Sequence, residues 1–80
     1  MKQQVKLYNF RMENGFAENL KSFRAERKIS QAALAEAIGV TQQCVSEWEQ
    51  KKTEPTLSYL WMISDLFGIS IDLLCGREEW

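Results

Sequence analysis

The chain has 80 residues, enough for one domain with a single modest core and too few for two. Two cysteines and no histidine exclude a disulfide framework and a Cys/His zinc site, and no apolar run approaches the roughly 18 residues of a membrane span. The chain has ten Lys and Arg and eleven Asp and Glu, and this slightly negative net charge argues weakly against nucleic-acid binding. The basic side chains are unevenly distributed, however, because residues 1–53 hold nine of the ten. We expect a soluble, cytoplasmic protein without a metal or a cofactor.

The opening segment, residues 1–14, is predicted to be an extended or poorly ordered arm. Tyr8, Phe10 and Met12 alternate with polar residues, which is typical of an extended stretch that packs one side on a surface. The simpler interpretation is that this surface belongs to the same domain.

Short helices with tight turns are predicted for the rest of the chain. Phe16, Leu20 and Phe23 form one apolar stripe, so a first helix should end near Arg27 and Lys28. A second helix is expected to begin at Ser30 and a third at Thr41, since both residues are good N-caps, and Gly39 separates the two helices.

Two further helices complete the predicted fold. Pro55 and Thr56 open a fourth helix that Gly68 stops, and Ser70 caps a short fifth helix that ends at Gly76. Since no strand is required, the fold class is all-α with five helices.

The most informative stretch is QAALAEAIGVTQQCVSEWEQ, residues 31–50. Two helices that cross steeply at a short turn need a small residue where their backbones approach, a corner residue that tolerates positive φ, and apolar side chains between them. Ala35 suits the first position and Gly39 the second, and the inward set comprises Leu34, Ile38, Val40, Val45 and Trp48.

From about Phe16 to Gly76 the sequence resembles the phage-repressor and Cro-like, or Xre-like, helix-turn-helix regulators. The likeness rests on SQAALAEAIGVTQQCVSEWEQ, on the fourth helix started by Pro55 and on the ending FGISIDLLCG. It implies a compact lambda-repressor-like domain over residues 15–76, with the helix-turn-helix at the second and third helices and a short tail at 77–80. This chain departs from the family in its acidity and at Lys51, where many members have Gly.

The outward face of the third helix is predicted to read DNA bases. With Val45 and Trp48 turned inward, polar side chains face the other way near the helix N-terminus, which a major groove admits. A glutamine amide can pair with adenine N6 and N7, and a glutamate can accept from cytosine N4. The predicted base-reading residues are Gln42, Gln43, Ser46 and Glu47.

Phosphate contacts should flank this reading helix, because backbone contacts supply position and affinity. Gln31 begins the second helix, where exposed N–H groups can hold a phosphate, and the resemblance assigns it that role. The other predicted phosphate-binding residues are Thr41, Lys51, Lys52, Thr53, Arg27 and Lys28. The resemblance also implies a structural ion pair between Arg24 and Glu49, joining the first and third helices.

A second apolar line on the fourth helix suggests a homodimer, since such domains place two reading helices in half-sites about 34 Å apart. The predicted interface comprises Tyr59, Met62, Leu66 and Trp80. The alternative is that residues 1–13 cover this line within one chain.

The sequence is therefore interpreted as a transcriptional regulator, favouring a repressor, that binds a double-stranded operator. An enzyme is disfavoured because there is no histidine base and no Gly-rich phosphate loop. An antitoxin that binds both its operator and a toxin, or another protein partner such as a co-regulator, is the stronger alternative.

Overall fold

The computed structural model describes residues 15–77, and in this range every regular element is an α-helix. The order along the chain is α2 (Phe16–Arg27), α3 (Gln31–Ile38), α4 (Gln42–Glu49), α5 (Leu57–Phe67) and α6 (Ile71–Leu74). The expected all-α architecture with five helices is confirmed for this part of the chain. The predicted arm at 1–14 and most of the predicted tail at 77–80 lie outside the described residues. None of the helices in residues 15–77 is long and apolar enough to span a membrane.

Four helices begin at a hydroxyl side chain. Each cap accepts a hydrogen bond from the backbone N–H three residues later, which satisfies a donor that the first helical turn leaves unpaired. The caps are Ser30, Thr41, Thr56 and Ser70. The expected starts at Ser30, Thr41 and Ser70 are confirmed, and at α5 the cap is Thr56, with Pro55 buried just before it.

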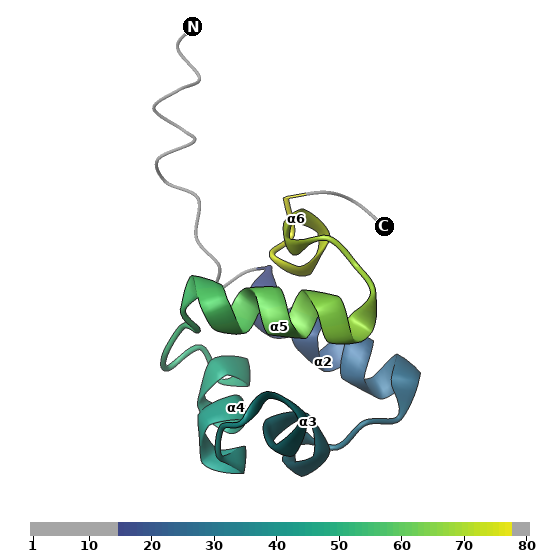
Figure 1. The fold of residues 1–80 in the computed structure, drawn as a ribbon. Helices are drawn as coiled ribbons and strands as arrows, with labels where there is room; N and C mark the ends of the chain where they lie inside the picture. The colour runs from purple at the N-terminus through teal and green to yellow at the C-terminus, as the bar shows by residue number, and fades with distance from the viewer. Residues whose placement is uncertain (1–14, 78–80) are drawn as a thin grey trace, which may run out of the picture.

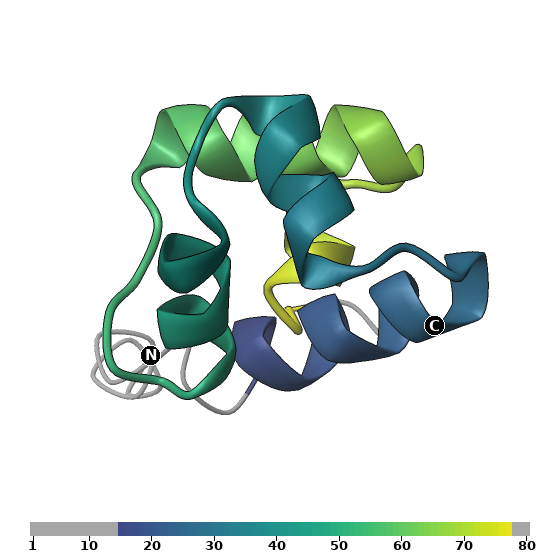
Figure 2. The same ribbon diagram turned by 90° about the horizontal axis from the view of Figure 1, so that it is seen from below.

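The core lies where α2, α3 and α4 meet the inner side of α5 and the short α6 (Figure 1). Figure 2 shows the arrangement from below, with α3 and α4 joined by a short connection and α5 crossing behind α3. Aromatic rings join the layers: Phe16 meets Trp48 edge-on at 6.3 Å, and Trp48 meets Tyr59 at 5.8 Å between ring centroids. The largest fully buried side chains are Phe16, Leu20, Leu34, Val45, Ile63 and Leu74.

Candidate nucleic-acid interface

A three-residue turn, Gly39 to Thr41, sets α4 against α3. Gly39 has φ 82° and ψ 32°, in the left-handed region, and the N–H groups of Gly39 and Val40 both donate to the Ala35 carbonyl at 2.9 Å. A left-handed backbone costs an L-residue about 1–2 kcal/mol, so glycine suits this corner. Ala35 is itself buried beneath the turn, as its small side chain predicts.

The two sides of α4 have opposite character. Val45 and Trp48 are buried against the rest of the domain, while Gln42 and Gln43 are exposed and Ser46 and Glu47 are half-buried. The four side chains predicted to read bases therefore share the side of α4 that the core leaves open. They are amide, hydroxyl and carboxylate groups, which can pair with base edges in a major groove.

Side-chain hydrogen bonds along α4 and from its C-cap residue Gln50 organise this polar side. The Gln43 amide nitrogen Nε2 donates to Glu47 Oε2 at 3.0 Å, and Gln50 Nε2 donates to Ser46 Oγ at 2.6 Å. Each bond joins residues one helical turn apart, where side chains on one face are neighbours. Gln50 was not among the predicted residues, although its spacing of four from Ser46 would have indicated it.

A buried ion pair fixes α4 against α2. Arg24 Nε and Nη2 donate to the two carboxylate oxygens of Glu49 at 2.7 and 2.9 Å, and Arg24 Nη1 donates to the Ile29 carbonyl at 2.8 Å. Glu49 is only 5% exposed. The hydrogen bond to Glu49 raises the pKa of Arg24 above its ordinary value, with burial acting in the opposite direction. The ion pair expected to join these helices is therefore present, and it is bidentate.

Gln31 belongs to the same network. It is the first residue of α3, and its Nε2 donates to Glu49 Oε1 at 3.0 Å. One N–H of the Gln31 amide is therefore used in a hydrogen bond within the protein. The Gln31 side chain is half-buried at the N-terminus of α3. This side chain connects α3 to the ion pair. It does so at the N-terminus of α3, where the sequence predicts a phosphate contact.

Cationic and hydroxyl side chains flank α4 at both ends. Thr41 is exposed at its N-cap, where its hydroxyl oxygen accepts from the Cys44 N–H at 3.1 Å. Lys51, Lys52 and Thr53 are exposed after its last turn, and Lys51 Nζ lies 3.9 Å from Glu18 Oε2. Lys28 is exposed after α2 and, like Lys51, has a positive φ.

Arg27, also predicted to bind phosphate, has a packing role in the structure. Its guanidinium lies 5.3 Å from the Phe23 ring centroid and 5.2 Å from that of Phe67, and its Nη2 donates to the Phe67 carbonyl at 2.9 Å. These contacts hold the end of α2 against the end of α5. The sequence did not reveal this role, because Phe67 lies forty positions away.

The cysteine on α4 is not an activated thiol. Burial raises the pKa of Cys44 above its ordinary value, and the negative charge of Glu47 raises it further. A raised pKa keeps the thiol protonated and unreactive at neutral pH. Cys44 is half-buried and packs against the hydrophobic core.

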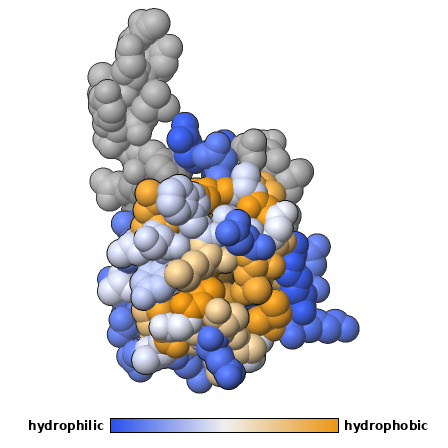
Figure 3. Space-filling view, in the orientation of Figure 1, coloured by the Kyte–Doolittle hydropathy of each residue, from blue (hydrophilic) through white to orange (hydrophobic). Residues whose placement is uncertain are grey.

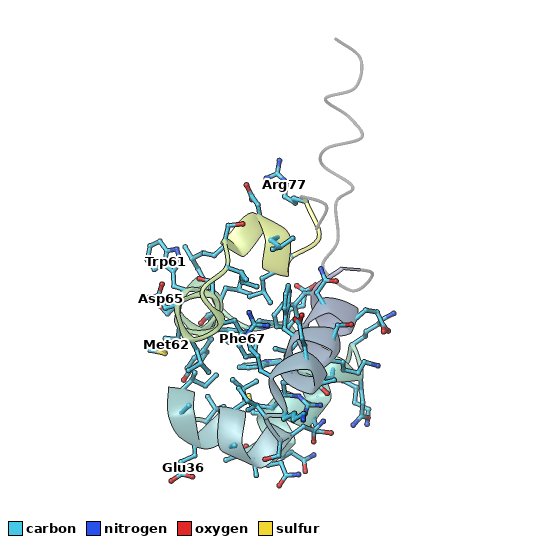
Figure 4. The ribbon with its side chains drawn as sticks, turned by 90° about the vertical axis from the view of Figure 1, so that its right-hand side faces the viewer. Glu36, Trp61, Met62, Asp65, Phe67 and Arg77 are labelled. Carbon is cyan, nitrogen blue, oxygen red and sulfur yellow. The ribbon has the colours of Figure 1, made fainter. Side chains whose placement is uncertain are left out.

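The outer side of α5 carries an exposed apolar face. Within residues 15–77, all the exposed large hydrophobic residues lie on this helix: Leu57, Trp61, Met62 and Leu66. Figure 3 shows apolar side chains gathered on this side of the molecule, and in Figure 4 Trp61 and Met62 project from α5 with Asp65 between them. We define these four residues as the α5 face.

The α5 face differs from the line predicted from the sequence. Met62 and Leu66 are exposed as expected, at 46% and 45%, whereas Tyr59 is half-buried and packs on Trp48. Trp61 and Leu57 were missed, although their spacing of four places them side by side on a helix. Trp80 lies outside the described residues.

The helix-turn-helix family model matches residues 20–74 of the chain. The chain therefore belongs to the helix-turn-helix family, in the phage-repressor and Cro-like group that its sequence resembles. The HTH-type transcriptional activator BcrR of Enterococcus faecalis is 36% identical over 64 residues, which cover 80% of this chain and 31% of BcrR.

A solved structure of the c2 repressor of Salmonella phage P22 in complex with a synthetic operator is also similar. It is 36% identical with a TM-score of 0.70, and the match covers 74% of this chain and 89% of that chain. (S)-2-hydroxypropylphosphonic acid epoxidase of Streptomyces wedmorensis is 43% identical over 61 residues, covering 75% of this chain and 31% of the enzyme. The chain spans between about a third and just over a half of the first curated relatives it matches.

Proposed function

We propose that the chain is a sequence-specific, double-stranded DNA-binding transcriptional regulator that reads the major groove with α4. The observation that carries the proposal is the polar side of α4, from Gln42 to Glu47, left open opposite the buried Val45 and Trp48. The similarity to a repressor solved with a synthetic operator supports it. Several relatives are named repressors, so we favour repression over activation. We propose that the protein acts in the cytoplasm.

Backbone phosphates are held, in this proposal, by residues at both ends of α4. Lys51, Lys52 and Thr53 are exposed after α4, Thr41 is exposed before it, and Gln31 lies at the N-terminus of α3. A helix N-terminus attracts an anion, and each lysine that meets a phosphate releases a counterion. Lys28 is exposed and extends the set, whereas Arg27 already binds the Phe67 carbonyl.

The chain acts by binding and not by catalysis. Its match to the epoxidase covers 31% of that enzyme, so the similarity is to a part of it and brings no activity with it. The matches to transcriptional regulators and phage repressors support the binding role.

We further propose that two copies associate through the α5 face. Large exposed apolar side chains on one helix are typical of an interaction site, and a two-fold pair places two reading helices in successive half-sites. Met62 and Leu66 come from the predicted interface, and Trp61 and Leu57 enlarge it.

The central test separates base reading from phosphate binding. Preferred duplexes are first selected from a random DNA pool and then titrated against scrambled duplexes at several salt concentrations. Gln43→Ala should weaken binding to the preferred duplex by roughly 1–3 kcal/mol and leave scrambled DNA nearly unaffected, because only base-edge bonds are lost. Lys52→Ala should weaken both and reduce the salt slope by about one.

Ser22→Ala, a change at an exposed polar residue of α2, is the matched control and should alter neither affinity. Equal weakening of both duplexes by Gln43→Ala would show that α4 is not the reading element.

A further inference from the structure

We propose that Gln43 and Glu47 act as one coupled reading pair, in which Gln43 selects adenine and Glu47 selects a neighbouring base that carries an amino group. The amino group must face the major groove, where cytosine and adenine present one and guanine and thymine do not, so guanine and thymine are rejected at the Glu47 position. The inference rests on the proposed function and specifies the operator chemistry that α4 recognises. Its basis is the hydrogen bond from Gln43 Nε2 to Glu47 Oε2, 3.0 Å long, on the open side of α4.

The bond to Glu47 fixes which way the Gln43 amide points. A carboxylate only accepts hydrogen bonds, so the amino end of the amide must face Glu47. One amide N–H is used there, while the second N–H and the carbonyl oxygen remain for DNA. These two groups match adenine, which presents an acceptor at N7 and a donor at N6. The hydrogen bond to Glu47 therefore holds the Gln43 amide in the orientation that pairing with adenine requires.

Glu47 supplies the second half of the pair. Oε2 accepts from Gln43, and no hydrogen bond from within residues 15–77 occupies Oε1. Cytosine N4 and adenine N6 can donate to this oxygen in the major groove. Guanine presents only acceptors there, and thymine presents an acceptor and a methyl group. A carboxylate facing either of these bases is repelled or left without a partner.

Helix geometry sets how far apart the two bases lie. Four residues along an α-helix rise about 6 Å, and successive base pairs rise about 3.4 Å. Gln43 and Glu47 therefore meet bases one or two steps apart.

The charge of Glu47 also affects DNA that does not match. A carboxylate between two rows of phosphates opposes binding unless an amino group compensates it. Glu47 is half-buried on α4 rather than extended into solvent, and its charge is felt at the neighbouring Cys44 thiol, whose pKa it helps to raise. The side chain thus acts against mismatched sequences as well as in favour of matched ones.

The test begins with duplexes that the wild-type protein selects from a random pool. In the best duplex, each position near the adenine is changed to all four bases, and affinities are measured for wild type and Glu47→Gln. Wild type should bind cytosine or adenine at one position at least about fivefold more tightly than guanine or thymine. In Glu47→Gln this ratio should fall below about twofold, because an amide donates as well as accepts. Glu36→Gln, the same charge change on α3, should retain the wild-type pattern.

A double-mutant cycle tests the coupling. Gln43→Ala should cost several-fold less affinity in a Glu47→Ala background than in wild type, because the amide is no longer oriented. Equal costs in the two backgrounds, or an unchanged base preference in Glu47→Gln, would overturn the inference while leaving the proposed function in place. A wild-type protein that enriches no sequence would instead overturn the proposed function itself.

Discussion

Glu49 is the one charged residue among residues 15–77 that is buried, and its carboxylate accepts three hydrogen bonds. Two come from Arg24 on α2 and one from Gln31 on α3, so a single carboxylate on α4 connects three helices. Removing a charge from water is costly, and a buried pair repays that cost only with good geometry and further hydrogen bonds. Both conditions are met here, and the ion pair sets how the helix-turn-helix sits on α2.

Arg24→Ala should destabilise the domain by about 3 kcal/mol, because Glu49 would be left buried without its cation. The double change Arg24→Met with Glu49→Leu should recover much of this loss, since apolar side chains of similar size need no charge compensation. Thermal and urea unfolding measure both values. A melting temperature unchanged by Arg24→Ala would contradict a structural role and make Arg24 a candidate for phosphate binding instead.

At the scale of the helix, the end of α4 is notable for a lysine in a left-handed conformation. Lys51 has φ 66°, its N–H donates to the Trp48 carbonyl, and the Lys52 N–H donates to the Glu47 carbonyl. This pattern is a Schellman motif, in which glycine is the usual left-handed residue. Lys51 therefore takes the left-handed position of this motif, although it carries a side chain.

Lys51→Gly should stabilise the domain by about 0.5–1 kcal/mol. The left-handed backbone costs an L-residue about 1–2 kcal/mol, and the greater freedom of glycine in the unfolded chain offsets part of the gain. Lys52→Gly is the matched control, because Lys52 does not have a positive φ and should gain nothing. Urea unfolding of both variants decides the matter, and a loss of stability in Lys51→Gly equal to that in Lys52→Gly would contradict the prediction.

At the scale of the whole molecule, the α5 face is the surface that we propose for self-association. Its four apolar residues are exposed, and Asp65 lies between Trp61 and Met62 on the same side of α5 (Figure 4). The inner side of this helix, with Leu60, Ile63 and Phe67, belongs to the core. A substitution on the outer side can therefore change association without disturbing the fold.

Met62→Glu should weaken self-association and leave the helical content intact, because it places a charge in an apolar contact. Sedimentation measures the first property and circular dichroism the second. Ser22→Glu adds the same charge at an exposed site on α2 and should not affect association. A wild-type protein that stays monomeric at high concentration and on its operator would contradict the dimer.

The sequence by itself was sufficient to predict the helices and the open side of α4. Ser30, Thr41 and Ser70 were identified as helix starts because an N-cap bonds to a backbone N–H three residues away, an interaction contained within one turn. The positive φ of Gly39 follows from the same local logic. Helical periodicity then placed Gln42, Gln43, Ser46 and Glu47 opposite the buried Val45 and Trp48.

Only the tertiary structure decided which side chains bond across the fold. The Asn19 side chain on α2 donates to the carbonyls of Leu73 and Leu74 at 3.1 and 3.2 Å. These hydrogen bonds join α2 to the C-terminal end of α6. Gly15 lies against the Cys75 carbonyl so closely that a Cβ would collide with it, although its φ of −126° is ordinary. Arg27 turned toward Phe67 because these helix ends meet. Such contacts join residues forty or more positions apart, and they depend on how the helices cross, which periodicity within one helix does not specify.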